Sequence, residues 1–98
     1  MKTFEQLIAD EKPVLVDFYA DWCAPCKMMP PILKEVKEDL GDQVTILKID
    51  VDKNPKVAAQ FQVRGIPTLI VFKKGQVQWR TSGVVPAAQL KQKLTEFI

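Results

Sequence analysis

The chain has 98 residues, of which 47% are hydrophobic and 27% are charged. This length supports one hydrophobic core, so we expect a single domain over residues 1–98, and the composition is typical of globular rather than disordered or fibrous proteins. The net charge of +2 and the scattered Lys and Arg residues favour neither a nucleic-acid nor a membrane partner, and no apolar run approaches the roughly 18 residues of a membrane span.

The N-terminus and the residue counts restrict location and chemistry. Residues 1–6 are too polar for the start of a signal peptide, so we expect a cytoplasmic protein, unless the chain is already processed. Two cysteines are too few for a disulfide-stapled secreted scaffold. The chain contains no histidine, which removes the commonest general base and the commonest metal ligand. We therefore expect no metal site and no bound cofactor.

The N-terminal half reads as a helix followed by a strand–helix–strand unit. Apolar residues at helical spacing predict a first helix over residues 3–9, with Thr3 as its N-cap. Residues 14–19 form a nearly unbroken apolar run of strand length, which is typical of a central strand covered on both faces. A helical pattern then runs to about Leu40, and a second strand follows over residues 44–50. These two strands should be parallel.

The C-terminal half reads as helix, hairpin and helix. Asn54 and Pro55 indicate a helix start, with Asn54 as N-cap and Pro55 at the first position. Strands are predicted over residues 68–73 and 77–81, joined by a turn, and Pro86 opens a last helix. We therefore predict an α/β fold: a mixed four-stranded sheet, made of a βαβ unit and a C-terminal ββα unit, with helices on both faces.

A Cys-x-x-Cys motif lies between the first predicted strand and the second helix, in the run Trp22-Cys23-Ala24-Pro25-Cys26. Cysteines three positions apart at a helix start are close enough to form and break a disulfide. Unpaired N–H groups and the helix dipole favour a thiolate at Cys23. The thiolate is the attacking species, so Cys23 is the expected nucleophile. Cys26 should lie one turn deeper and less exposed, where it resolves the mixed disulfide.

Two other interpretations of this motif remain open on the residues alone. A Cys-x-x-Cys pair is half of a zinc site, which a dimer sharing the metal would complete. The pair could also form a purely structural disulfide, although so short a loop would add little stability. A redox motif is favoured, because strand, Cys-x-x-Cys and helix in a βαβ context are typical of thiol–disulfide exchange.

Three ordered motifs resemble those of the thioredoxin family. They are the run from Val16 to Lys27, the run Arg64-Gly65-Ile66-Pro67-Thr68, and the turn Phe72-Lys73-Lys74-Gly75. Matching positions extend over nearly the whole chain. The resemblance implies a thioredoxin-like fold and an electron carrier that reduces protein disulfides. It also implies disulfide-containing proteins as substrates, recharging by a flavin-dependent thioredoxin reductase that uses NADPH, and a monomeric state.

Asp17 and Lys48 match a buried aspartate and a nearby lysine of that family. A carboxylate inside an apolar strand is costly and should have a raised pKa, so Asp17 could take the proton from Cys26, directly or through water. The alternatives are an aspartate satisfied by solvent or backbone and a lysine that only extends from a sheet edge into water. Tyr19, where many members have tryptophan, could shield the site.

Pro67 matches the family's cis-proline, which faces the cysteines; an ordinary trans proline at a strand start is the alternative. The backbone of Ile66 could then pair with an extended substrate strand. Ala24 stands where the family usually has glycine, which leaves every reacting group in place. The expected apolar substrate-binding rim around Cys23 consists of Trp22, Ala24, Pro25, Ile66, Gly83 and Val84.

Pro31 matches a proline that kinks the family's helix, and Pro30 is additional. Together they leave the carbonyls of Cys26 and Lys27 without helical partners, which predicts a pronounced bend just after the motif, with these carbonyls hydrated or otherwise satisfied. The alternative is a helix that begins anew at Pro30.

The usual N-terminal strand of the family is missing from this sequence. Residues 44–50 should therefore form an edge of the sheet, where Lys48, Asp50 and Asp52 could discourage pairing with other chains.

Two other functions compete with disulfide reduction. Relatives that oxidise or isomerise disulfides commonly have a histidine between the cysteines, whereas Ala24 and Pro25 carry no charge and favour a reductant. A non-catalytic binding module would use the apolar rim alone, and the presence of both cysteines, Asp17 and Pro67 argues against it.

Overall fold

The α-helices and strands follow one another along the chain in the predicted order. The computed structural model describes residues 2–98, so Met1 of the predicted domain lies outside the described residues. In chain order the elements are α1 (Phe4–Ile8), β1 (Val14–Tyr19), the 3-10 helix η1 (Pro25–Met28), α2 (Met29–Leu40), the 3-10 helix η2 (Gly41–Gln43), β2 (Thr45–Asp50), α3 (Pro55–Gln60), β3 (Thr68–Lys73), β4 (Gln76–Ser82) and α4 (Ala87–Thr95).

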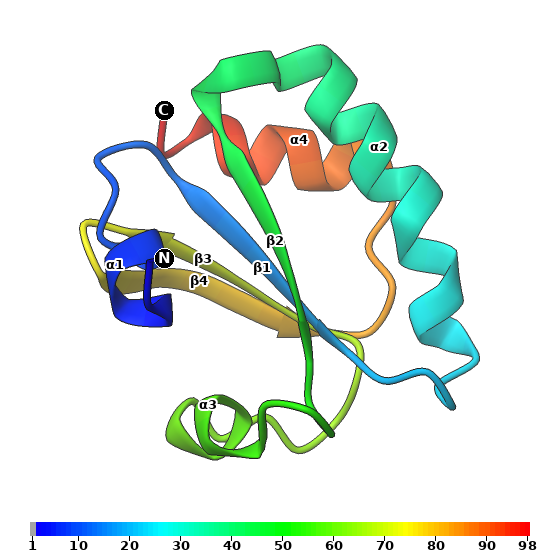
Figure 1. The fold of residues 1–98 in the computed structure, drawn as a ribbon. Helices are drawn as coiled ribbons and strands as arrows, with labels where there is room; N and C mark the ends of the chain where they lie inside the picture. Colours follow the sequence, from blue (N-terminus) through cyan, green and yellow to red (C-terminus); the bar gives the residue numbers. More distant parts are fainter. Residues whose placement is uncertain (1) are drawn as a thin grey trace.

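The four strands form one mixed sheet in the order β2-β1-β3-β4, which confirms the predicted fold (Figure 1). β1 pairs in parallel with β2 and antiparallel with β3, and β3 pairs antiparallel with β4. β2 is an edge of the sheet, as predicted. Because β1 lies inside the sheet and both of its faces are covered, residues 14–18 are buried, which explains their nearly unbroken apolar sequence.

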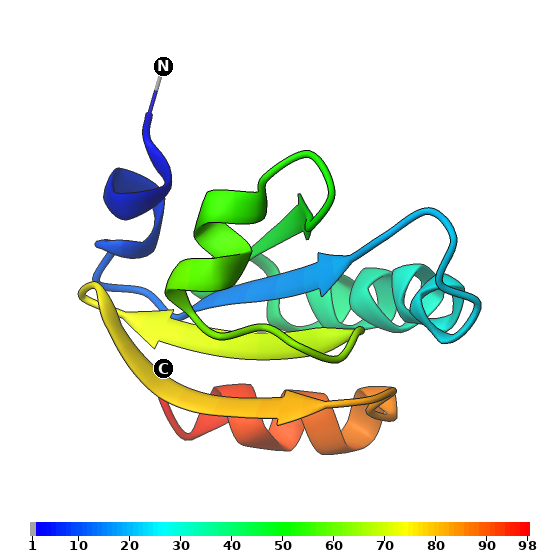
Figure 2. The ribbon, with the colours of Figure 1, turned by 90° about the horizontal axis from the view of Figure 1, so that it is seen from below.

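Helices cover both faces of the sheet, so the protein has two hydrophobic layers (Figure 2). On one face α2 and α4 pack over a cluster that includes Leu15, Met29 and Leu90. On the other face α1 and α3 pack over a cluster that includes Phe18 and Phe72. Alternate residues of β1 therefore face opposite layers. Among residues 2–98, no helix has the length and apolarity needed to cross a membrane.

The strand directions bring four chain segments to one end of the sheet. The parallel strands β1 and β2 end there, β3 begins there because it is antiparallel to β1, and β4 ends there because it is antiparallel to β3. Segments 20–24, 51–54, 65–67 and 83–86 therefore meet beside the start of η1 and α2 (Figure 1). This end of the sheet carries the motif residues.

Two of the predicted helix starts have their capping residues in place. Thr3 forms a capping box with Gln6, which confirms it as an N-cap. Asn54 occupies the N-cap position and Pro55 the first position of α3, but the Asn54 side chain makes no capping hydrogen bond. Its amide group donates instead to the backbone carbonyl of Asp50 at 3.0 Å. The side chain of Asn54 therefore ties α3 back to the end of β2.

The helix type changes where the sequence predicts a bend, and the bend itself stays a prediction. η1 ends at Met28 and α2 begins at Met29, close to the alternative of a new helix at Pro30. The carbonyl of Cys26 has another partner, as expected, because it accepts a hydrogen bond from the N–H of Met29. Pro30 and Pro31 fit the first turn of α2, where an N–H is not needed for the helical ladder.

The aromatic contacts of Phe4 attach α1 to the rest of the fold. Its ring lies 5.7 Å from that of Phe61 and 5.8 Å from that of Phe72. We expect Phe4→Ala to lower the free energy of unfolding by about 2 kcal/mol, because a partly buried ring and two aromatic contacts are lost. Urea unfolding measures this change. Glu5→Ala, at an exposed position of the same helix, is the matched control, and an equal loss in both variants would contradict the prediction.

Candidate active site

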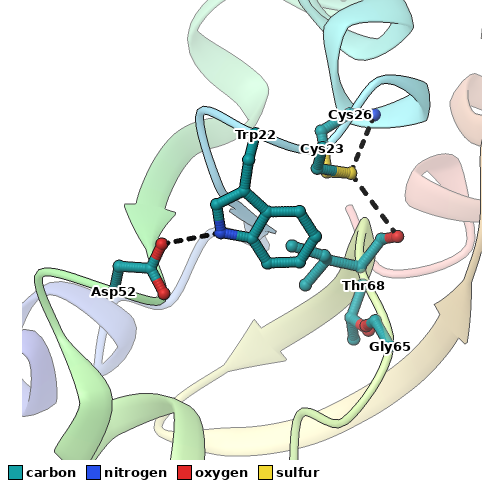
Figure 3. The surroundings of a disulfide bond; sticks show 7 residues. Trp22, Cys23, Cys26, Asp52, Gly65 and Thr68 are labelled. Carbon is teal, nitrogen blue, oxygen red and sulfur yellow. Dashed lines mark hydrogen bonds between the residues drawn. A yellow bond between two sulfur atoms is a disulfide. The ribbon is translucent and has the colours of Figure 1, made fainter.

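Cys23 and Cys26 form a disulfide at the start of η1, with their Cα atoms 5.3 Å apart and their sulfur atoms 2.22 Å apart (Figure 3). Cys23 lies in the loop after β1, and its N–H donates to the carbonyl of Ala20 at 3.2 Å. Cys26 lies in the first turn of η1. The pair is therefore close enough to cycle between dithiol and disulfide, as the spacing predicts.

The two cysteines are equally buried, so the expected difference in exposure is wrong for this disulfide form. Each has 4% of its surface exposed, since Tyr19, Val51 and Ile66 pack around them. The N–H of Cys26 points at the Sγ of Cys23, 3.2 Å away. After reduction this donor would favour a thiolate at Cys23, because a hydrogen bond to the charged form stabilises it. The two cysteines therefore differ in the N–H donor that points at Cys23, and not in the exposed fraction of their surfaces.

The Ile66–Pro67 peptide bond is cis, as the resemblance implies. The carbonyl oxygen of Ile66 lies 3.7 Å from the Sγ of Cys23, so this loop faces the disulfide (Figure 3). Two contacts hold the loop: the carbonyl of Pro67 accepts a hydrogen bond from the N–H of Gly83 at 2.8 Å, and the hydroxyl of Thr68 donates to the carbonyl of Gly65. Sequence reasoning gave Thr68 no role, although it follows Pro67 directly.

Trp22 is anchored at its indole nitrogen and otherwise open to solvent. Its side chain is 70% exposed, and Nε1 donates to a carboxylate oxygen of Asp52 at 2.8 Å (Figure 3). Asp52 was expected only at the sheet edge. The signal that would have found it is the parallel pairing of the two predicted strands, because Trp22 and Asp52 each follow the carboxyl end of one strand.

Asp50 lies in the edge strand β2, as expected, but its side chain does not face solvent there. It is buried, and its carboxylate accepts hydrogen bonds from the N–H groups of Asp52 and Lys53 at 2.9 and 3.3 Å. The carboxylate of Asp50 stabilises the turn after β2 instead of facing solvent at the sheet edge. A short aspartate side chain readily accepts hydrogen bonds from backbone N–H groups two or three residues ahead. Of the three residues expected to discourage pairing at the sheet edge, only Lys48 is an exposed residue within β2.

The remaining predicted rim residues differ in how far they reach solvent. Ala24 and Pro25 are exposed, whereas Ile66 and Gly83 are partly buried beside the cysteines and the cis bond. Val84 is partly buried and packs against the cluster under α2 and α4. The structure therefore brings an open apolar surface to one side of Cys23, with Val84 turned toward the core.

Asp17 is a buried carboxyl group in the middle of β1. It is 1% exposed, and its Oδ1 has no hydrogen-bond partner among residues 2–98, so the alternative of an aspartate satisfied by the backbone does not hold for this atom. Burial raises the pKa of Asp17 from the ordinary 3.8 to about 6, against an opposing effect of the nearby Lys48 charge. At neutral pH the group is mostly ionised and able to accept a proton.

A small pocket connects this carboxyl group with the resolving cysteine. Its volume is about 140 Å³, which is room for a few water molecules. Asp17, Cys26 and Lys48 all line it, together with Tyr19, Ala20, Asp21, Lys27 and Pro30. The carboxyl group of Asp17 and the side chain of Cys26 therefore border the same pocket.

Lys48 lies opposite Asp17 in the parallel register of β1 and β2. Lys48 is exposed and forms no salt bridge among residues 2–98. Its ammonium nitrogen lies 5.6 Å from the centre of the Tyr19 ring, a cation–π contact. Lys48 thus acts on Asp17 through space rather than through a direct ion pair.

Comparison with known proteins agrees with this site. The family model described as thioredoxin matches residues 1–96. A thioredoxin-like protein, slr0233, of Synechocystis is 52% identical over 94 residues, covering 96% of this chain and 90% of its own. Thioredoxin 1 of Chlorobaculum tepidum is 43% identical over 98 residues, covering 99% and 97%. A chain from a structure concerned with thiol resolution in a yeast mitochondrial 1-Cys peroxiredoxin via glutathione/thioredoxin systems superimposes with a TM-score of 0.85 at 34% identity, over 95% of this chain and 86% of that one.

The raised pKa of Asp17 makes stability depend on pH in a defined direction. Between its unfolded pKa of 3.8 and its folded value of about 6, the folded state binds the proton more tightly, so stability falls as pH rises through this window. Asp17→Asn removes the charge. We expect it to raise the free energy of unfolding at pH 7.5 by about 2–3 kcal/mol, and by much less near pH 3.5. Urea unfolding of the disulfide form at both pH values measures this.

Asp42→Asn, at an exposed aspartate, is the matched control and should change stability little at either pH. A stabilisation by Asp17→Asn that is the same at both pH values would contradict the assignment of a raised pKa to Asp17.

Proposed function

The chain belongs to the thioredoxin family, and on that premise we propose a role for each residue of its site. The protein is a thiol–disulfide oxidoreductase that reduces protein disulfides. The observation that carries this function is the Cys23–Cys26 pair at the end of the sheet, beside the cis Ile66–Pro67 bond. Reduction proceeds by two exchanges of sulfur partners.

In the first exchange the thiolate of Cys23 attacks one sulfur of a substrate disulfide. A bond forms between that sulfur and the Sγ of Cys23, and the other substrate sulfur leaves as a thiolate that takes a proton from water. The N–H of Cys26, 3.2 Å from this Sγ in the disulfide form, supports the thiolate before the attack. Cys23 is therefore the nucleophile.

In the second exchange the thiol of Cys26 loses its proton to Asp17 and attacks the Sγ of Cys23. The mixed disulfide breaks, the second substrate sulfur leaves and is protonated, and the Cys23–Cys26 disulfide forms. The substrate has gained two electrons and two protons, which the two cysteines have lost. The buried carboxyl of Asp17 and the shared pocket support its role as the base, and the charge of Lys48 keeps it ionised.

Substrate binding is assigned to the surface around Cys23. The backbone of Ile66, beside Pro67, pairs with an extended substrate strand, which places the substrate disulfide over Cys23. Trp22, Ala24 and Pro25 supply exposed apolar contact, and Gly83 and Val84 border it from the loop after β4. The hydrogen bond from the indole of Trp22 to Asp52 holds this part of the substrate-binding surface in one orientation.

Family membership implies disulfide-containing proteins as substrates and a thioredoxin reductase as the source of electrons. We assign that reductase the use of flavin and NADPH. We further propose that residues 1–98 form one domain, that the protein acts as a monomer in the cytoplasm, and that it works away from nucleic acids and membranes. The two hydrophobic layers around one sheet support the single domain.

Serine variants of the two cysteines test the assignment of nucleophile and resolving thiol. We expect Cys23→Ser to lower the rate of insulin reduction by dithiothreitol more than about 100-fold, because a hydroxyl cannot replace the thiolate. Cys26→Ser should instead accumulate a stable mixed disulfide with the substrate, which mass spectrometry of the non-reduced protein detects.

Ala88→Ser, at an exposed position of α4, is the matched control and should reduce insulin at the unchanged rate. No acceleration of insulin reduction by the unmodified protein would indicate a binding module and contradict the proposed function. Trapping by Cys23→Ser rather than Cys26→Ser would reverse the two roles.

The role of Asp17 as a base predicts a pH-dependent defect in the second exchange. We expect Asp17→Asn to slow the release of substrate from the mixed disulfide at least about 10-fold at pH 7, because Cys26 loses its proton acceptor. Above about pH 9 the defect should shrink, since the thiol ionises without help. Rapid acid quench of a single turnover measures release. An equal defect at both pH values would show that Asp17 acts on structure instead.

A further inference from the structure

Tyr19 shares a face of the sheet with the two charged groups of the site. Asp17 and Tyr19 are two positions apart in β1, so their side chains lie on the same face. Lys48 stands opposite Asp17 in the parallel register, and Asp50 stands opposite Tyr19. Lys48 therefore has Asp17 as its direct neighbour across the strands and Tyr19 as its diagonal neighbour.

Lys48 needs a partner to stay near Asp17. Its side chain ends in solvent on a stem with four rotatable bonds, and among residues 2–98 it makes no salt bridge that would fix it. The ring of Tyr19 is the contact observed for its ammonium group, at 5.6 Å from the ring centre. An aromatic face attracts a cation because of the negative charge above its centre.

We propose that Tyr19 is a positioning residue: its ring holds the ammonium group of Lys48 at the pocket, where that positive charge favours the ionised, proton-accepting form of Asp17. Only the catalytic effect of this positioning rests on the proposed role of Asp17 as a base. The link from the ring through the ammonium group to the carboxyl group stands on the geometry of the pocket, which Tyr19, Lys48 and Asp17 all line.

Among the residues around Asp17, Lys48 carries the charge that the ring of Tyr19 would hold in position. Across the other side of β1, the residue opposite Asp17 is the apolar Leu69. The pocket is also lined by Asp21 from the loop and by Cys26 and Lys27 from η1, and Lys48 is the group whose charge lowers the pKa of Asp17 against the effect of burial. A movement of Lys48 away from the pocket would therefore raise the pKa of Asp17.

A double-mutant cycle on Tyr19 and Lys48 tests the proposal. The pKa of Asp17 is measured by carboxyl-carbon NMR titration of the disulfide form, which requires no catalysis, in the unmodified protein, Tyr19→Leu, Lys48→Met and the double variant. We expect Tyr19→Leu to raise the pKa of Asp17 by about half a unit when Lys48 is present. In the Lys48→Met background the same substitution should not raise it.

Two controls separate positioning from a change of burial. Tyr19→Phe keeps the aromatic face and should leave the pKa of Asp17 close to that of the unmodified protein. Loss of the ring also alters the exposure of the pocket to water, but that effect occurs in both backgrounds and cancels in the cycle. Tyr19→Met provides a second non-aromatic variant in case Tyr19→Leu does not fold.

The outcomes distinguish this inference from the proposed function. An equal change of the Asp17 pKa in both backgrounds, or an equal change in Tyr19→Phe and Tyr19→Leu, would overturn the positioning role. A coupling in the cycle supports it, and the pH profile of substrate release should then shift in Tyr19→Leu in the same direction as the Asp17 pKa. Coupling with an unshifted release profile would uphold the positioning of Lys48 and overturn the role of Asp17 as the base.

Discussion

The burial of one carboxyl group in the central strand is the constraint on which the chemistry of the site depends. Because β1 is paired on both sides, Asp17 has no sheet edge beside it, and its Oδ1 has no hydrogen-bond partner among residues 2–98. A charged carboxylate is costly to bury in such a place. The same isolation strengthens the hold of Asp17 on a proton, which suits it to receive one from Cys26.

The rest of the site is held together by strand directions rather than by contacts between neighbours in sequence. Trp22 and Asp52 meet because β1 and β2 run in parallel and end together. Pro67 and Gly83 meet because the hairpin of β3 and β4 opens at that same end. A change of register in any one of these pairs would separate the disulfide from the surface that presents a substrate to it.

Apolar spacing is sufficient to predict the four strands, the four α-helices and the parallel pairing, since those follow from local periodicity and from right-handed crossover, but it does not predict the 3-10 helices η1 and η2. The cis bond before Pro67 came only from family resemblance, because an X–Pro sequence by itself leaves both isomers open. The equal burial of the cysteines and the inward turn of Asp50 were missed. Both depend on tertiary packing at the end of the sheet, which no local pattern encodes.

The first residues of η1 and α2 have N–H groups that are already paired, whereas the start of a helix usually has unpaired ones. Amides at such an end commonly attract phosphate and other small anions. Here the N–H groups of Cys23, Lys27 and Met29 donate to backbone carbonyls, that of Cys26 points at sulfur, and the two prolines that follow Met29 have none. An inorganic anion would therefore meet N–H groups that are already paired at these four residues, and the amide of Cys26 is directed at the sulfur of Cys23.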